Sequence, residues 1–445
     1  MIMAAKKWKI LIHSMTFARD FGMTYLLSRL LSKMGCECMI ANNSNITSMP
    51  MRLWNPDAVF FVTPSRAEKL AKTYPNAKLF MFSAEGSVNY SRSETEIVQN
   101  PKMLNLFTRL YLWGEEPRKY VSGKYMLTPN ATAEMFDSKF KVSGNPRGDI
   151  VKYGIRKKKT DKIKIGFIGN FWILNTIKKD FSIFSYLIEK HSNTRTWDDI
   201  ISQIRYLKVF TEIIGQLDMG KYEISLRPYP LERKDIYYDI DYVKKHGIEI
   251  DESIDFSSWL SKQDIIIGNG ISTTISLLTI GKIPFINLTK VCGSSLEIYE
   301  KVMPPQLMSV ITKNSPSTIE ETLEKIRTYE DHVYYDSNSE NLLHELYSTK
   351  SSSSSILNTA IDIVSILNKS EAEPQLKSKL PFKIIKMLDC LDMKYKSFRN
   401  RGMMDNDYSF FLYGDVLAKV QEEFDPVYDG ILNDSENQKI IAGSK

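Results

Sequence analysis

Short apolar runs alternate with segments of helical periodicity through the first third of the chain. Residues 17–34 and 66–74 carry apolar side chains at helical spacing, and Gly35 ends the first of these segments. Strands that alternate with helices in this way are typical of a parallel sheet covered on both faces. The strands predicted in this part are residues 8–13, 36–41, 57–63, 78–85, 109–114, 124–128 and 139–144.

The same alternation restarts after a polar, basic stretch at residues 152–162. Such a stretch is typical of a domain boundary. Beyond it, strands are predicted at residues 162–171, 222–230, 264–270 and 283–288, and helices at residues 178–191 and 200–217. We therefore predict an α/β protein of the GT-B type, with two doubly wound, Rossmann-type domains facing a central cleft and a C-terminal helical tail. The predicted domains are residues 1–152, 162–348 and 349–445.

The tail has a different pattern from the two domains. Five serines at residues 351–355 precede a predicted helix at residues 356–368, and residues 377–401 form a basic amphipathic helix. Two interpretations of this last helix stay open. It contacts the anionic inner face of the cytoplasmic membrane, or it packs across the two domains with its lysines in solvent.

Composition narrows the class of protein. A chain of 445 residues is too long for one ordinary hydrophobic core. Its content of 43% hydrophobic and 25% charged residues is usual for a folded soluble protein. A formal net charge of +6 suits an anionic substrate or a membrane surface and is too small to indicate nucleic-acid binding. The four cysteines lack metal-ligand spacing, and no apolar run approaches the roughly 18 residues of a membrane span. We expect a cytoplasmic protein that is at most peripheral at the membrane.

The second half carries a candidate phosphate site. Residues 268–284 (GNGISTTISLLTIGKIP) read as a strand end, a turn at Gly270, and a helix that begins among the hydroxyls of Ser272, Thr273 and Thr274. A helix N-terminus offers free N–H groups and a partial positive charge to a phosphate, and the hydroxyls can add hydrogen bonds. The alternative is ordinary N-capping, which needs a single hydroxyl.

Two further strand ends in this half carry candidate donor-binding residues. In SLRPYP (225–230), Arg227 can pair with a phosphate, and Tyr229 can stack on a base or donate a hydrogen bond. The alternative, which this motif alone favours, is a surface ion pair for Arg227 and a lid over the core for Tyr229. In IGFIGNF (165–171), Gly169 and Asn170 can approach a diphosphate or a sugar closely.

In the first half, two carboxylates follow predicted strands. Glu85 lies in FSAEG and Asp149 in SGNPRGD. Two carboxylates at one sheet edge can serve glycosyl chemistry, one as an ionised nucleophile or base and the other as a proton donor. The alternative is that Asp149 caps the following helix and Glu85 pairs with an arginine. His13 ends the first strand and ranks low, because a lone histidine is usually structural.

Together, GNPRGD, AEG, RPYP and the hydroxyl-rich turn before GKIP resemble the surface carbohydrate biosynthesis family. These are GT-B-type bacterial glycosyltransferases related to the retaining β-Kdo transferases. The resemblance covers roughly residues 8–330 in motif order, and GNPRGD is its most specific part.

The resemblance implies a CMP-activated sugar acid, Kdo or a related nonulosonate, as donor, and a surface polysaccharide or lipopolysaccharide as acceptor. It implies that Asp149 attacks the anomeric carbon and Glu85 assists proton transfer, so that two displacements retain configuration. Arg147 can offset the charge of the sugar carboxylate, with Asn145 beside it. The donor nucleotide would lie against the second domain, and the acceptor glycan against the first. No metal and no cofactor are expected.

One departure from the family affects the donor. Tyr229 stands where relatives usually carry histidine, and tyrosine, with a reference pKa of about 10, mainly donates hydrogen bonds. The alternative functions are a non-hydrolysing UDP-sugar 2-epimerase, a CDP-polyol phosphotransferase and a catalytically silent scaffold of a polysaccharide assembly complex.

Overall fold

The computed structural model divides the chain into two compact units. Unit 1 comprises Met1–Gly154 and Glu340–Lys445, and unit 2 comprises Ile155–Ser339. The chain thus leaves unit 1 after Gly154, close to the predicted boundary, and re-enters unit 1 at Glu340. The structure describes residues 8–15, 17–43, 45–82, 92–154, 161–176, 182–189, 194–269, 274–300, 303, 305–330, 341, 345–347, 353–369, 384, 387–388 and 414–443.

Unit 1 is built on a six-stranded parallel sheet with the order β2-β1-β3-β4-β5-β6. Its strands are β1 (Lys9–His13), β2 (Glu37–Ala41), β3 (Ala58–Phe61), β4 (Lys78–Phe82), β5 (Arg109–Leu112) and β6 (Phe140–Val142). The helices between them are α1 (Phe17–Lys33), α2 (Met49–Trp54), η1 (Pro64–Arg66), α3 (Ala67–Thr73), α4 (Arg92–Val98), α5 (Pro101–Leu106), α6 (Glu115–Tyr125), α7 (Ala133–Lys139) and α8 (Pro146–Tyr153).

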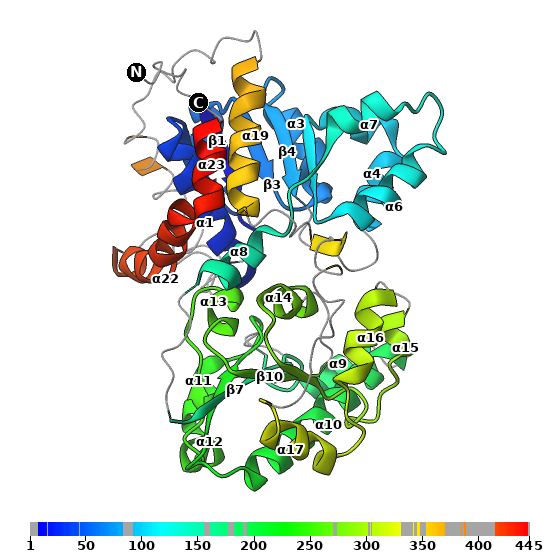
Figure 1. The fold of residues 1–445 in the computed structure, drawn as a ribbon, viewed down its shortest axis with the longest axis vertical. Helices are drawn as coiled ribbons and strands as arrows, with labels where there is room; N and C mark the ends of the chain where they lie inside the picture. The colour runs from blue at the N-terminus through cyan, green and yellow to red at the C-terminus, as the bar shows by residue number, and fades with distance from the viewer. Residues whose placement is uncertain are drawn as a thin grey trace. The chain divides into compact units, whose positions relative to one another are not determined.

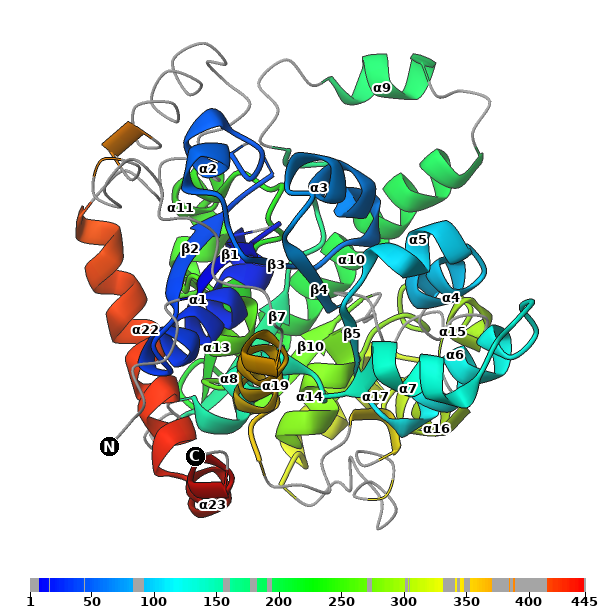
Figure 2. The same cartoon turned by 90° about the horizontal axis from the view of Figure 1, so that it is seen from above.

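Successive side chains of these strands point to opposite faces of the sheet. Leu11, Val59 and Leu79 belong to a buried cluster that includes side chains of α2, α3, α5 and α6. The other face carries Tyr111, whose hydroxyl donates to Asp362 of α19 (Ser355–Lys369) at 3.0 Å. Figures 1 and 2 show α1 and α19 together on this second face. The C-terminal α19 therefore helps to cover the second face of this sheet.

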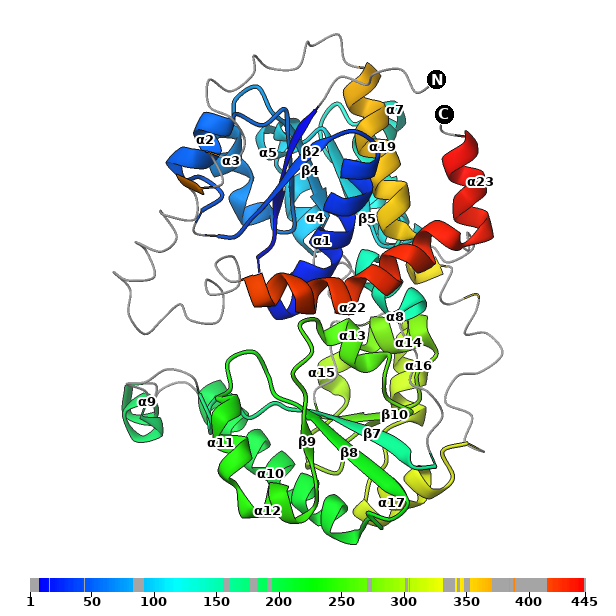
Figure 3. The ribbon, with the colours of Figure 1, turned by 90° about the vertical axis from the view of Figure 1, so that its left-hand side faces the viewer.

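Two more C-terminal helices belong to unit 1. α22 (Gly414–Asn433) packs against α1 and α8, and α23 (Ser435–Gly443) packs against α22 (Figure 3). Arg29 of α1 pairs with Asp425 of α22 at 2.6 Å. Of the basic stretch 377–401, only residues 384, 387 and 388 are described, so the membrane-surface prediction lies largely outside the described residues. Within the part that is described, no helix is long and apolar enough to cross a membrane.

Unit 2 has a five-stranded parallel sheet with the order β11-β10-β7-β8-β9. Its strands are β7 (Ile163–Ile168), β8 (Tyr222–Arg227), β9 (Glu249–Ile250), β10 (Ile265–Gly268) and β11 (Phe285–Asn287). Its helices are α9 (Ile183–Glu189), α10 (Thr194–Gln216), α11 (Lys234–Asp239), α12 (Asp241–Lys245), α13 (Phe256–Leu260), α14 (Thr274–Gly281), α15 (Glu297–Glu300), α16 (Pro305–Lys313) and α17 (Ile319–Arg327).

Helices cover both faces of this second sheet. Ile165 and Phe167 lie in a buried cluster with side chains of α10 and α17. On the other face, a Cβ at Gly166 would lie 2.9 Å from the ring of Trp259, which donates to Ser225 at 2.9 Å. The missing side chain of Gly166 thus lets α13 pack directly on the centre of the sheet.

One predicted strand is wrong. Residues 124–128 (KYMLT) begin inside α6 and continue as a turn. The buried residues of this helix are spaced four apart, at Pro117, Val121 and Tyr125, whereas Leu127 is 81% exposed. The apolar run therefore does not mark a buried strand, and the helical spacing that starts upstream of it decides the structure.

Candidate active site

The strand order of unit 2 marks one place as a ligand site. β7 and β10 are neighbours, and the chain leaves β7 toward β8 on one side and leaves β10 toward β11 on the other. In open parallel sheets, ligands bind outside the carboxyl ends of the strands at such a switch point. The predicted donor-binding residues Gly169 and Asn170 follow β7 directly, and Thr274 begins α14 after β10.

Gly169 sits where a side chain has no room. A Cβ at this position would lie 2.8 Å from the carbonyl oxygen of Arg227 and 3.0 Å from Cα of Pro228. The Gly169 amide also donates to that carbonyl at 2.7 Å. The sequence predicted a close approach at Gly169, and the structure places the neighbouring RPYP turn there. Asn170, the next residue, is half-buried at the same strand end.

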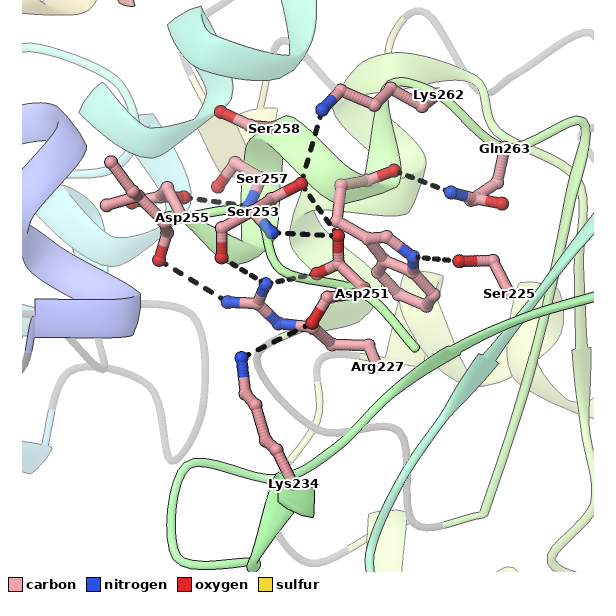
Figure 4. Close-up of polar contacts among 12 residues, drawn as sticks. Ser225, Arg227, Lys234, Asp251, Ser253, Asp255, Ser257, Ser258, Lys262 and Gln263 are labelled. Carbon is pink, nitrogen blue, oxygen red and sulfur yellow. Dashed lines mark hydrogen bonds and ion pairs between the residues drawn. The ribbon is translucent and has the colours of Figure 1, made fainter. Parts of the chain in front are cut away.

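Arg227 is buried and makes its contacts inside unit 2. Its guanidinium pairs with Asp251 and donates to the carbonyl oxygens of Ser253 and Ile254 (Figure 4). The side chains of Arg227 and Asp251 are each 5% exposed. These contacts hold the loop between β9 and α13 against the end of β8. They do not support the predicted pairing of Arg227 with a donor phosphate, because a phosphate would have to displace Asp251.

Two other predicted donor-binding residues of unit 2 are at least partly exposed. Tyr229, two residues beyond β8, is 43% exposed. Thr274 is half-buried at the first turn of the eight-residue α14. Gly270, Ser272 and Thr273 lie outside the described residues. Among the residues that are described, no group of three His, Cys, Asp or Glu side chains is placed to hold a metal ion.

Glu232 is a structural partner of this site that the sequence analysis missed. Its carboxylate accepts hydrogen bonds from the Phe171 amide and from the Tyr237 hydroxyl, the latter at 2.6 Å. Burial raises the pKa of Glu232, while these hydrogen bonds act in the opposite direction. The carboxylate ties the turn after β7 to the turn after β8. No sequence spacing marks this role, because the two turns are 61 residues apart.

The GNPRGD motif forms the junction between β6 and α8 in unit 1. Asn145 is the N-cap of α8, and its side-chain oxygen accepts from the Arg147 amide at 3.1 Å. Pro146 takes the first helical position, where a missing N–H costs nothing. The guanidinium of Arg147 is buried 5.6 Å from the ring centre of Trp113. The two glycines and the proline of the motif therefore start a buried helix.

Asp149 is bound to the N-terminus of another helix, α19. Its carboxylate accepts from the Ser354 hydroxyl at 2.7 Å and from the amides of Ser355 and Ile356 at 3.2 and 2.8 Å. Burial raises the pKa of Asp149 to about 6, and the three hydrogen bonds oppose this rise. The predicted nucleophile thus has the contacts of a cap, and the helix that it caps is α19 instead of the one that follows it. Glu85, the second predicted carboxylate, lies outside the described residues.

No protein-family model and no curated protein matches this sequence. Solved structures do resemble it. The wall teichoic acid polymerase TagF, soaked with CDPG, aligns with a TM-score of 0.50 and 11% identity over 82% of this chain and 91% of that chain. A second TagF structure aligns with a TM-score of 0.49 and 11% identity over 82% of this chain and 92% of that chain. The spinosyn forosaminyltransferase SpnP aligns with a TM-score of 0.39 and 10% identity over 80% of this chain and 99% of that chain. The chain therefore has a GT-B-like fold of two Rossmann-type units.

Proposed function

We propose that this protein is a GT-B-type transferase that takes its donor as a cytidine nucleotide and passes the activated group to a surface glycan. The donor that we favour is a CMP-linked sugar acid, Kdo or a related nonulosonate. The observation that carries the proposal is the switch point of unit 2, where the Gly169 turn follows β7 and α14 follows the neighbouring strand β10. A nucleotide site at this position is the general expectation for the fold.

The residues around this switch point suit a nucleoside monophosphate leaving group. The N-terminus of α14, which begins at Thr274, can supply hydrogen-bond donors to a phosphate without a metal. Ser272 and Thr273 precede it in the sequence and are the further hydroxyls of the proposed site. The exposed ring of Tyr229 is available to stack on the base. Arg227 contributes indirectly, because its contacts with Asp251 fix the loop beside that base.

A second candidate function is the transfer of a polyol phosphate from a CDP-linked donor. The fold likeness to a wall teichoic acid polymerase, whose structure was obtained with CDPG, favours this candidate. Both candidates use a cytidine nucleotide, and they differ in the group that leaves it.

The chemistry of the proposed reaction differs from a double displacement. Asp149 can attack a donor only after losing three hydrogen bonds to α19. We therefore assign proton removal from the acceptor hydroxyl to Glu85 and leave Asp149 in the cap. The acceptor oxygen then forms its bond to the anomeric carbon as the bond to CMP breaks, which gives inversion of configuration.

The first test is nucleotide selectivity in the whole chain. We expect CMP or CDP to raise the unfolding temperature and UDP to have little effect, since a ligand at a hundredfold excess over its Kd stabilises the folded state by about 2.7 kcal/mol. Tyr229→Ala should weaken binding by about 1–3 kcal/mol, the usual contribution of one base stacked on an aromatic ring. Tyr120→Ala, a change at a similarly exposed tyrosine of unit 1, is the matched control.

A response to UDP without a response to CMP or CDP rejects the cytidine donor and favours the epimerase. The absence of any nucleotide response favours the scaffold. Once a cytidine nucleotide binds, acceptor-dependent release of CMP from CMP-Kdo or from CDP-glycerol separates the two candidate donors.

A further inference from the structure

Helix α10 of unit 2 carries large apolar side chains on both of its faces. Its inner side chains belong to the buried cluster on the sheet, and the hydroxyl of Tyr206 donates to the carbonyl oxygen of Ile168 at 2.7 Å. Its outer side chains include Trp197, Ile201 and Ile204, which are 43%, 41% and 52% exposed. A helix that covers a sheet needs only one apolar face, so packing inside unit 2 explains the inner face alone.

The outer apolar residues form one row along the helix. Steps of four, three and four residues separate the members of this outer row, which are Trp197, Ile201, Ile204 and Lys208. At 3.6 residues per turn they lie within an arc of about 60°. Alternating steps of four and three are the spacing of a seam between two packed helices. Leu207, 42% exposed, lies beside the row and widens its apolar surface.

Opposite charges flank the outer row on one side. Asp198 and Arg205 are exposed and seven residues apart, so they lie at nearly the same angle around the helix, one toward each end of the row. Arg205 donates to the carbonyl oxygen of Gly293 at 3.4 Å, which occupies one of the five N–H groups of the guanidinium. Lys208, at the second end of the row, is 74% exposed and lies 3.6 Å from Glu212. Such a surface pair holds its members weakly.

We propose that α10 is a dimerisation surface, on which the α10 of a second copy of this chain packs antiparallel. A two-fold axis at the middle of the outer row places Ile201 opposite the partner's Ile204, and Ile204 opposite the partner's Ile201. It also places Trp197 opposite the partner's Lys208, where an ammonium group over an indole ring forms a favourable cation–π pair. A two-fold interface requires self-complementarity of this kind.

The charges select a second copy as the partner and fix its direction. Antiparallel packing brings Asp198 beside the partner's Arg205 twice in each dimer, once on each side of the axis. Parallel packing would set Lys208 against the partner's Lys208 in the seam. An anionic membrane would accept the apolar row but would repel Asp198. One helix pair is a small interface, so we expect a Kd on the order of 10–100 µM. This inference goes beyond the proposed function and does not depend on the donor.

Sedimentation velocity on the full chain, from about 1 to about 300 µM, spans the expected Kd. We expect a reversible equilibrium between monomer and dimer. A chain that stays monomeric throughout this range overturns the proposal. Cosedimentation with phosphatidylglycerol vesicles is measured beside it. A monomer that binds these vesicles and loses that binding in Trp197→Ser would assign the outer row to a membrane instead.

Ile204→Glu tests the seam. Each dimer then loses two isoleucine side chains from its centre and gains two charges there, so we expect association about a hundredfold weaker or more. Leu53→Glu, at a residue of α2 that is 41% exposed, is the matched control. The unfolding temperature of Ile204→Glu at about 1 µM, where wild type is also monomeric at the expected Kd, should equal that of wild type. A dimer that persists in Ile204→Glu, or that is lost equally in Leu53→Glu, overturns the assignment to α10.

Charge exchange tests the direction of packing. Asp198→Arg alone and Arg205→Asp alone put like charges together on both sides of the axis, so we expect each variant to self-associate about tenfold more weakly at about 50 mM salt. An equal mixture of the two variants pairs opposite charges again, and we expect a mixed dimer with wild-type affinity. The double variant should also dimerise as wild type does. A mixture that fails to associate, or an Asp198→Arg chain that associates more tightly than wild type, overturns antiparallel pairing of α10.

Discussion

Asp149→Ala provides the sharpest test of the roles assigned above. The substitution removes the acceptor of three hydrogen bonds and leaves the amides of Ser355 and Ile356 without their partner at the start of α19. A buried donor left unsatisfied costs about 1–3 kcal/mol, and two of them give about 2–6 kcal/mol. Two effects reduce this loss of stability: water can enter the space left by the carboxylate, and the variant no longer buries a charge. We therefore expect a loss of about 3 kcal/mol.

Hydrogen exchange is the appropriate assay, because a chain with two units need not unfold in one step. Exchange of the α19 amides reports the local opening of this helix, and about 3 kcal/mol corresponds to exchange about a hundredfold faster. The amides of α10, in unit 2, should exchange at the wild-type rate and serve as the internal control.

Two companion variants grade the effect. Asp149→Asn keeps one acceptor oxygen and should fall between wild type and Asp149→Ala. Ser354→Ala removes the hydroxyl that accepts from the Leu357 amide at 3.1 Å, and should cost about 1 kcal/mol as an ordinary N-cap does. If α19 exchanges at the wild-type rate in Asp149→Ala while transferase activity is lost, the cap role is refuted and the carboxylate is catalytic.

Three further outcomes follow from the same contacts. Gly169→Ala should weaken nucleotide binding at least tenfold, because the new Cβ would lie 2.8 Å from a backbone oxygen and would shift the RPYP turn. A wild-type affinity in calorimetric titration would contradict this. Arg227→Gln should destabilise unit 2 by about 3–5 kcal/mol because Asp251 is left buried without its cation; a loss below about 1 kcal/mol in urea unfolding would argue against the buried pair. The folded Asp149 carboxyl, with a pKa of about 6, holds its proton where the unfolded carboxyl, near 4, has lost it. The unfolding free energy of wild type minus that of Asp149→Asn should therefore fall as pH rises from about 4 to about 6, and a rise would reverse the assigned sign.

The strands could be predicted from the sequence because each is a local signal. Every strand of unit 1 lies inside a predicted run, as the alternation of apolar segments and helices requires. The strand predicted at residues 124–128 was wrong because a short apolar run also fits the end of a helix. The neighbours that bury Val121 and Tyr125 are not visible in the run itself. The two-residue β9 is too short to leave a pattern.

The roles of the site residues depended on contacts that spacing does not reveal. Asp149 was recognised as a carboxylate after a strand, but its partner Ser354 lies 205 residues later. Arg227 was placed correctly at the end of β8, and its charge is balanced by Asp251 from a neighbouring strand end. Gly169 was predicted to permit a close approach, and the atom that approaches belongs to the protein. Residue type and position are local properties, whereas hydrogen-bond partners are set by the fold.

The interrupted course of unit 1 has a consequence for how the chain is made. The ribosome completes the whole of unit 2 before it releases α19, which covers one face of the first sheet. Domains generally fold as units in the order of their synthesis, so here the later-begun unit can finish first. A fragment ending at Gly154 would leave the ring of Tyr111 exposed to water, and we expect such a fragment to bind chaperones or aggregate, while residues 155–339 alone should be soluble.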